Sequence, residues 1–209
     1  MTATMSTLAI TPEDRLRAGD PAAAGEVFAA CRERLKKMVR LRLDRRLQGR
    51  FDASDVLQEA FLDVQKKAAD FPTKDMPAYL WLRLIVAERL LILHRHHLGV
   101  QMRDAGQEVS LHRGGLPNAS THSLANLLLG RMTSPTQAAI RAERQVRLQE
   151  SLNGMEELDR EILALRHFEE LNNSETATVL GLTKTAASNR YIRALKRLKE
   201  ILAGLPGGV

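Results

Sequence analysis

Residues 158–202 read LDREILALRHFEELNNSETATVLGLTKTAASNRYIRALKRLKEIL, and they decide the fold because three helical patterns follow one another here. Apolar side chains recur at helical spacing over residues 158–168, which predicts the first helix. Asn172 stands three residues before Glu175, the spacing of a capping box, and a short second helix over residues 174–180 should follow. That helix should end at Gly181, since glycine tolerates the left-handed conformation that closes a helix.

A third helix is predicted over residues 184–202, with Thr183 as its N-cap. A short helix, a glycine-containing turn and a longer helix form the helix-turn-helix pattern. One face of the third helix is apolar and should pack on the core, while the other carries short polar side chains and arginines suited to base edges and phosphates. The alternative is the solvated face of an ordinary three-helix bundle. We predict as the recognition set Lys184, Thr185, Ser188, Asn189, Arg190 and Arg193.

The composition favours a helical protein with an anionic partner. The chain has 209 residues, of which 44% are hydrophobic and only 4% aromatic, and 31 Lys and Arg stand against 25 Asp and Glu, a net charge of +6. This length suits one large or two small domains packed by aliphatic side chains. The N-terminus shows no signal peptide, and the apolar run at residues 80–93 is too short to span a bilayer. We therefore expect no membrane insertion and a cytoplasmic location.

The N-terminal part contains four predicted helices. Thr11 and Pro12 begin the first helix, and a break at residues 19–21 separates it from a second with a regular apolar stripe. Asp52 should cap a third helix that runs to about residue 70. A loop with two prolines follows at residues 71–78, and a long helix occupies about residues 78–97.

The helical periodicity fades after residue 98 and returns at residue 134. Gly, Asn, Ser and His accumulate between these points, which predicts a linker with a brief helix over residues 124–129. We expect an all-α protein with two small helical domains. The predicted organisation is an N-terminal tail (1–11), a first domain (12–98), a linker (99–134), a helix-turn-helix domain (135–204) and a C-terminal tail (205–209).

The segments ASDVLQEAFLDV (53–64) and YLWLRLIVAERLLILHR (79–95) together resemble region 2 of bacterial sigma factors. The C-terminal helix-turn-helix resembles their region 4. Two such regions without a third domain between them are the layout of the extracytoplasmic-function (ECF) group of the sigma-70 family. The resemblance implies a factor that binds core RNA polymerase and promoter DNA and directs transcription initiation. It implies no cofactor and no enzymatic activity, and no phosphate-binding, metalloprotease or serine-hydrolase motif occurs in the sequence.

The resemblance also assigns residues to three tasks. The polymerase contact is carried by Asp55, Gln58, Glu59 and Asp63. The opened strand of the −10 promoter element is bound by Lys66, Lys67, Lys74, Trp81, Arg83, Arg89 and Arg95. The recognition set of the last helix reads the −35 element in the major groove. For Trp81 there are two interpretations, stacking on a base or capping the core, and its apolar neighbours favour the core.

Several features leave alternatives open. Glu88 and Ile92 depart from the polar pattern common in the family and put detailed −10 contacts in doubt. His94, His96 and His97 cannot share one helical face, so we expect no metal site. A stand-alone helix-turn-helix regulator is the main alternative function, and an adaptor that binds only proteins is a third. The resemblance allows an anti-sigma protein as a further partner.

Overall fold

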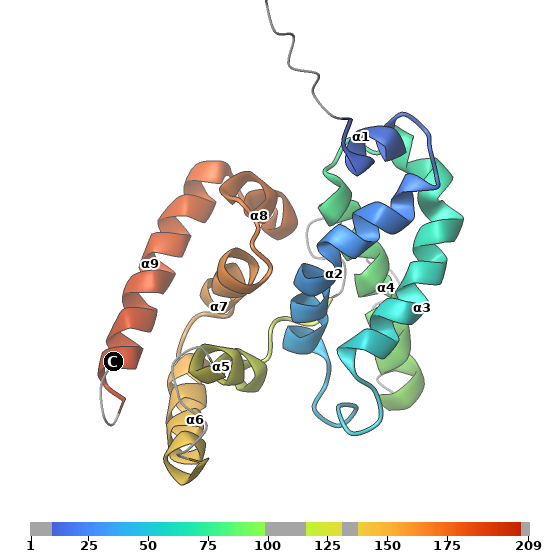
Figure 1. The fold of residues 1–209 in the computed structure, drawn as a ribbon. Helices are drawn as coiled ribbons and strands as arrows, with labels where there is room; N and C mark the ends of the chain where they lie inside the picture. Colours follow the sequence, from blue (N-terminus) through green and yellow to red (C-terminus); the bar gives the residue numbers. More distant parts are fainter. Residues whose placement is uncertain (1–9, 99–115, 131–137, 206–209) are drawn as a thin grey trace, which may run out of the picture.

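The computed structural model describes residues 10–98, 116–130 and 138–205, and these residues form helices and connecting turns without any strand. The all-α prediction is thus confirmed. Figure 1 shows an N-terminal and a C-terminal group of helices lying side by side. The N-terminal group comprises α1 (Pro12–Arg17), α2 (Ala23–Arg42), α3 (Ala53–Lys67), the 3₁₀ helix η1 (Ala68–Thr73) and α4 (Ala78–Leu98). The C-terminal group comprises α5 (Thr121–Gly130), α6 (Ala138–Asn153), α7 (Glu157–Leu163), the π-helical turn η2 (Ala164–Phe168), α8 (Asn173–Leu180) and α9 (Lys184–Ala203).

The N-terminal group is organised around α2, which packs against α1, α3 and α4. Thr11 and Asp52 cap α1 and α3, as predicted, and the structure shows that each does so through a capping box, which satisfies helix donors that would otherwise lack a partner. Phe28 of α2 and Phe61 of α3 meet with ring centroids 5.1 Å apart. These contacts hold the N-terminal helices as one packed unit.

The segment after α3 is more ordered than the predicted loop. The α-helix ends at Lys67, three residues earlier than expected, and continues as η1 through Pro72. Phe71 is completely buried, and its ring centroid lies 5.1 Å from that of Trp81. This aromatic pair packs η1 against the first turn of α4, which begins at Ala78 after a four-residue connection.

Part of the predicted linker is a packed helix. α5 spans residues 121–130, longer than the predicted 124–129, and its Leu124 and Leu129 are fully buried between α2 and α6. The backbone N–H of Ser120 donates to the carbonyl oxygen of Leu41 over 2.9 Å. The rest of the predicted linker lies outside the described residues.

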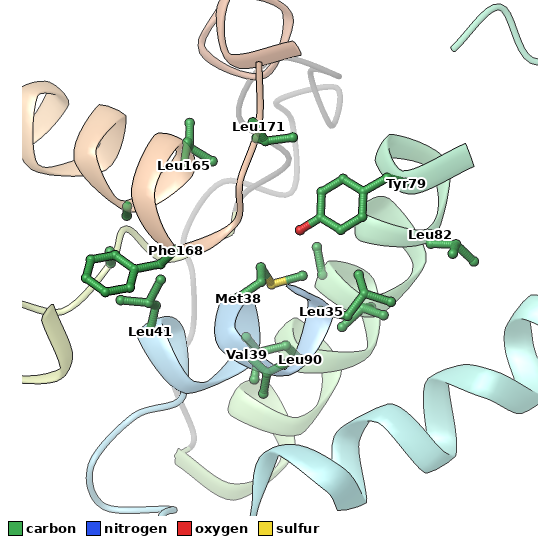
Figure 2. Close-up of a cluster of buried hydrophobic side chains, with 14 of the residues drawn as sticks. Leu35, Met38, Val39, Leu41, Tyr79, Leu82, Leu90, Leu165, Phe168 and Leu171 are labelled. Atoms are coloured by element: carbon green, nitrogen blue, oxygen red, sulfur yellow. The ribbon is translucent and has the colours of Figure 1, made fainter. Parts of the chain in front are cut away.

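The buried hydrophobic residues form one cluster that extends from α1 to the end of α9. Figure 2 shows how the two groups of helices meet, with Phe168 of η2 beside Leu41 of α2. Phe168 and Leu41 are 2% and 0% exposed. Apolar contact therefore joins the groups, which the sequence predicted only as two domains connected by a linker.

A buried network of four charges lies beside this apolar contact. Arg42, the last residue of α2, is completely buried and pairs with Glu161 of α7 and with Glu169, the residue after η2. The second oxygen of Glu169 accepts from Nε of Arg83 on α4 over 2.7 Å. Burial alone would raise the pKa of Glu169, but the charges and hydrogen bonds of Arg42 and Arg83 lower it. Glu169 thus remains ionised and links three helices.

Further contacts surround this network. Arg34 of α2 donates to the carbonyl oxygens of Glu169 and Glu170, and its guanidinium lies 3.7 Å from the ring centre of Tyr79. Lys37 pairs with the carboxylate of Glu170 at 2.7 Å. The turn after η2 is therefore held by both its backbone and its side chains.

We expect Glu169→Gln to destabilise the protein strongly, because it leaves two buried arginines with one carboxylate fewer. Removing one partner of a buried ion pair costs about 3–5 kcal/mol. Urea unfolding followed by circular dichroism measures the loss. Glu200→Gln is the matched control, since it removes an exposed pair with Arg197 and should cost at most about 1 kcal/mol. Equal losses in the two variants would contradict this account of the network.

The loop between α2 and α3 is attached to α4 through a histidine. The backbone N–H of Asp44 donates to Nε2 of His94 over 3.3 Å, and the His94 ring is buried. Burial lowers the pKa of His94; the carboxylate of Asp44 acts in the opposite direction, and the positive charge of Arg46 adds to the effect of burial. A hydrogen bond from Arg46 holds the pKa of Asp44 at about 2. Because Nε2 accepts a hydrogen bond, the docked loop requires a neutral imidazole.

This histidine should make stability depend on pH in the acid range. In the unfolded chain His94 takes up a proton near pH 6.5, whereas the folded protein resists it until lower pH. The contribution is therefore fully present above about pH 6.5 and is lost as the pH falls through the folded-state pKa. Urea unfolding across this range should give a shallower pH dependence for His94→Gln. The exposed His96→Gln should keep the wild-type dependence, and an unchanged slope in His94→Gln would count against the assignment.

Candidate nucleic-acid interface

The predicted helix-turn-helix is present with its predicted local signals. Asn172 caps α8 in a capping box with Glu175, with hydrogen bonds of 2.8 and 2.9 Å. Gly181 ends α8 in the left-handed conformation, at φ 64° and ψ 35°. Thr183 accepts from the N–H of Ala186 over 3.1 Å and begins α9. The observed helices extend only one residue beyond the predicted bounds, at the start of α8 and at the end of α9.

The outward face of α9 is polar and basic. Ala187, Ala194 and Leu198 lie on the opposite face and are buried in the core. The predicted residues Lys184, Thr185 and Asn189 are exposed, and Ser188 is half-buried. Further along the helix the outward face continues through Ile192, Lys196 and Lys199. These side chains form the outward stripe of α9, which we define as Thr185, Ser188, Asn189, Ile192, Lys196 and Lys199.

The structure places the two predicted arginines beside α7. Arg190 is half-buried, and its Nη1 lies 2.6 Å from Glu156 Oε2 and 2.7 Å from Asp159 Oδ1. Arg193 lies 3.3 Å from Asp159 through its Nε, although more than half of its side chain is exposed. Hydrogen bonds to Glu156 and Asp159 raise the pKa of Arg190. Both arginines thus have acidic partners within the chain, and Arg190 faces the bundle.

A second candidate surface is a hollow of about 620 Å³ on the N-terminal half, between η1 and α4. Its apolar lining includes Trp81 and Ile85, which come from α4. Four of the seven residues predicted for the opened strand line this hollow: Lys67, Lys74, Trp81 and Arg95. Acidic residues are also present, since Asp70 and Glu88 belong to the lining. The hollow therefore combines an apolar wall with cations and hydrogen-bond acceptors.

Trp81 is buried, so the interpretation that places it in the core describes its position. The remaining three of the seven predicted residues lie elsewhere. Arg83 is buried in the ion network with Glu169 and is not presented to solvent in this arrangement of the helices. Arg89 pairs with Asp63, and Lys66 is exposed on α3.

The predicted polymerase-binding residues lie on α3, and they differ in exposure and in their contacts within the chain. Gln58 and Glu59 are exposed. Asp55 is exposed as well, but its carboxylate accepts from the backbone N–H of Asp52 over 2.8 Å and so belongs to the cap of α3. Asp63 is half-buried in its pair with Arg89 of α4. The free part of this face is therefore smaller than the sequence predicted.

Two exposed aliphatic residues were missed by the sequence analysis. Leu62 on α3 is 56% exposed, and Ile192 on α9 is 62% exposed. Each stands one or two helical turns from predicted site residues: Leu62 follows Gln58 by four residues, and Ile192 follows Thr185 by seven. Because three to four residues complete one helical turn, this spacing alone places them on the same faces. In the sequence analysis, apolar residues of these two helices are considered only as core residues, and so Leu62 and Ile192 are not included among the site residues.

The fold and the outward stripe of α9 together define a helix-turn-helix DNA-binding protein. No helix in the part of the chain that the structure describes is both long and apolar enough to cross a membrane. The same described residues contain no group of three or more side chains able to hold a metal ion.

Comparisons with known proteins give one family match and several relatives. Residues 145–198 match the family Sigma-70, region 4. Over 183 residues the chain is 28% identical to the ECF RNA polymerase sigma factors SigD of Mycobacterium bovis and Mycobacterium tuberculosis, covering 88% of this chain and 78% of each relative. The solved structure of CnrH in complex with the cytosolic domain of CnrY has the same fold, with a TM-score of 0.50 and 21% identity over 91% of this chain and 94% of that chain.

Residues 145–198 thus carry region 4 of the sigma-70 family, and over most of its length the chain is similar to ECF RNA polymerase sigma factors. Its region 4 is the helix-turn-helix described above. The family is non-enzymatic, in agreement with the expectation from the sequence.

Arg190→Ala should reduce the stability of the C-terminal half, because Asp159 is only 6% exposed and loses its shorter contact. Arg193 remains beside Asp159, so we expect a loss of about 1–2 kcal/mol, within the range for a buried polar group left partly unsatisfied. Urea unfolding measures it. The exposed Lys199→Ala is the control and should unfold like the wild type. Identical curves for both variants would show that Arg190 has no framework role.

Proposed function

We propose that this sigma factor divides promoter recognition between its two halves. The domain of residues 12–98 binds core RNA polymerase through α3 and holds the opened strand of the −10 element at the hollow between η1 and α4. The domain of residues 135–204 reads the −35 element with α9, and residues 99–134 connect the two. The observation that carries the proposal is the presence, in one chain, of two surfaces suited to different forms of DNA.

The hollow is suited to unpaired DNA. Proteins bind single strands by combining cations that follow the backbone with apolar or aromatic surfaces against which bases pack. Lys74 and Arg95 supply cations, and Ile85 supplies part of the apolar wall. Glu88 pairs with Lys67 at 2.7 Å, which offsets its charge beside the expected path of the strand. The departure from the family pattern at Glu88 is thereby accommodated within the hollow.

The outward stripe of α9 is suited to a duplex. A recognition helix enters the major groove with its N-terminal residues on base edges, and only there are all four base pairs distinguishable. Thr185 and Asn189 are exposed near the start of α9, and Lys196 and Lys199 follow on the same face. Short polar side chains thus come first and flexible cations later, an order that suits base contacts followed by phosphate contacts.

The proposed polymerase contact centres on Gln58, Glu59 and Leu62 of α3. Stable interfaces usually place an apolar anchor inside a polar rim. Leu62 supplies the anchor, and the amide of Gln58 and the carboxylate of Glu59 supply the rim. Asp55 and Asp63 act indirectly in this proposal, by capping α3 and by holding Arg89.

One further partner is proposed from the comparisons. CnrH was solved in complex with the cytosolic domain of CnrY, and we extend this to a proposal that an anti-sigma protein binds the present chain. Promoters and core polymerase are cytoplasmic partners in bacteria, so the proposed place of action is the cytoplasm. A stand-alone regulator would bind the same upstream DNA without polymerase, and the face of α3 separates the two possibilities.

Glu59→Lys and Leu62→Ala should each weaken association with core polymerase, about fivefold or more, because each removes part of one interface. The measurement is fluorescence anisotropy of the labelled full-length chain titrated with purified core polymerase. Charge reversal at Asp55 is unsuitable, since it would also break the cap of α3.

Glu143→Lys is the matched control for Glu59→Lys. Glu59 lies 3.6 Å from Nη1 of Arg89, and Glu143 is likewise an exposed helical glutamate paired with an arginine, but it lies on α6 in the other half. Wild-type affinity in Glu143→Lys together with weakened binding in the α3 variants supports the assignment. Absence of any association between the wild-type chain and core polymerase would favour the stand-alone regulator instead.

A further inference from the structure

Ile192 occupies an unusual place for a large aliphatic residue. It is 62% exposed and lies near the middle of the outward stripe of α9. Ser188 and Asn189 precede it by four and three residues, and Lys196 follows it by four. Residues three and four apart are neighbours on a helix. Three of these four neighbours of Ile192 are therefore polar or basic, and the fourth, Leu195, is half-buried against the core.

Ile192 has no evident task in the fold. The core face of α9 is supplied by Ala187, Ala194 and Leu198, which are buried on the opposite side. A single exposed aliphatic residue is common on protein surfaces and by itself means nothing. What gives this one a meaning is its position among the side chains that face the DNA in the proposed function, on which the inference rests.

We propose that Ile192 determines promoter specificity by contacting the C5-methyl group of a thymine in the −35 element. The methyl group of thymine is the distinctive apolar feature of the major groove, and apolar side chains are its usual partners. Polar neighbours such as Asn189 cannot supply this contact, because they lose hydration against a methyl group without gaining a hydrogen bond.

The geometry of α9 predicts how far the contacted thymine lies from the bases that Thr185 contacts. Ile192 follows Thr185 by seven residues, which is about 10.5 Å along the helix axis at 1.5 Å per residue. Base pairs are stacked about 3.4 Å apart. Because a recognition helix is inclined to the stacking direction, the thymine should lie about two to three base pairs from the bases under Thr185. Lys196, one turn further along the stripe, would reach the phosphates beyond it.

The test uses the full-length chain assembled with core polymerase. Upstream elements are first selected from a randomised promoter library. Each thymine of the selected −35 element is then replaced by deoxyuridine, which removes only the C5-methyl group. Competition binding compares the two DNAs for the wild type, for Ile192→Ala and for Val146→Ala. Val146 is the matched control, because it is a 56% exposed aliphatic residue on α6.

We expect deoxyuridine at one position to weaken wild-type binding about three- to tenfold, since one buried methyl group is worth about 0.8 kcal/mol or somewhat more. Ile192→Ala should bind both DNAs equally, and Val146→Ala should discriminate like the wild type. Undiminished discrimination in Ile192→Ala, or wild-type indifference to every methyl group, would overturn the assignment. Weaker association of Ile192→Ala with core polymerase would overturn it too, by identifying a protein contact. A holoenzyme that selects no upstream sequence would overturn the proposed function itself.

Discussion

The buried carboxylate of Glu169 constrains the arrangement of the whole molecule. An ionised carboxylate without solvent exposure is tolerated only where opposite charges and hydrogen bonds replace its hydration. Arg42 and Arg83 come from two different helices of the N-terminal group, so the turn after η2 can occupy only one place relative to both. Glu170 adopts a positive φ of 58° at this turn and directs its own carboxylate outward to Lys37. Apolar packing of Phe168 stabilises the contact between the two groups of helices, and the buried ion pairs fix their relative position.

Which parts of this fold are predictable from sequence follows from the distance along the chain over which each interaction acts. The caps at Asn172 and Thr183 join residues three apart, and the turn at Gly181 depends on one residue, so the helix-turn-helix could be recognised locally. The partner of Arg83 lies 86 residues away. Nothing in the neighbourhood of Arg83 distinguishes a buried arginine from one that faces DNA, and its positive charge favoured the second interpretation. The start of α5 does have a local signal, because Ser120 Oγ accepts from the backbone N–H of Ser123 over 3.0 Å just before the helix begins.

In the candidate site, too, features set by neighbouring residues were predictable and those set by tertiary contacts were not, although one locally predictable residue was overlooked. The residue types on α9 and its core face were predictable, but both arginines were grouped with the outward face, although the rotation of the helix places Arg190 beside α7. The burial of Ala187 and Ala194 sets that rotation and turns Arg190 toward Asp159 of α7. Ile192 could have been placed on the outward stripe from its spacing to Thr185 alone. It was overlooked because an aliphatic residue in a helix is usually a core residue.

The acidic residues at the start of α7 reduce the number of cations that α9 can offer to DNA. Glu156 and Asp159 already partner Arg190 and Arg193, so the stripe offers mainly its lysines to phosphates. Each phosphate contact adds affinity for any sequence and releases a counterion, and a helix with few such contacts binds nonspecific DNA weakly. Base contacts then account for a larger share of its binding, which favours discrimination over affinity. Such a helix needs a second attachment to remain on a promoter, and in the proposed function core polymerase, bound through α3, would supply one with a high effective concentration. Weak DNA attraction in α9 is therefore consistent with a factor that reads promoters only as part of a larger enzyme.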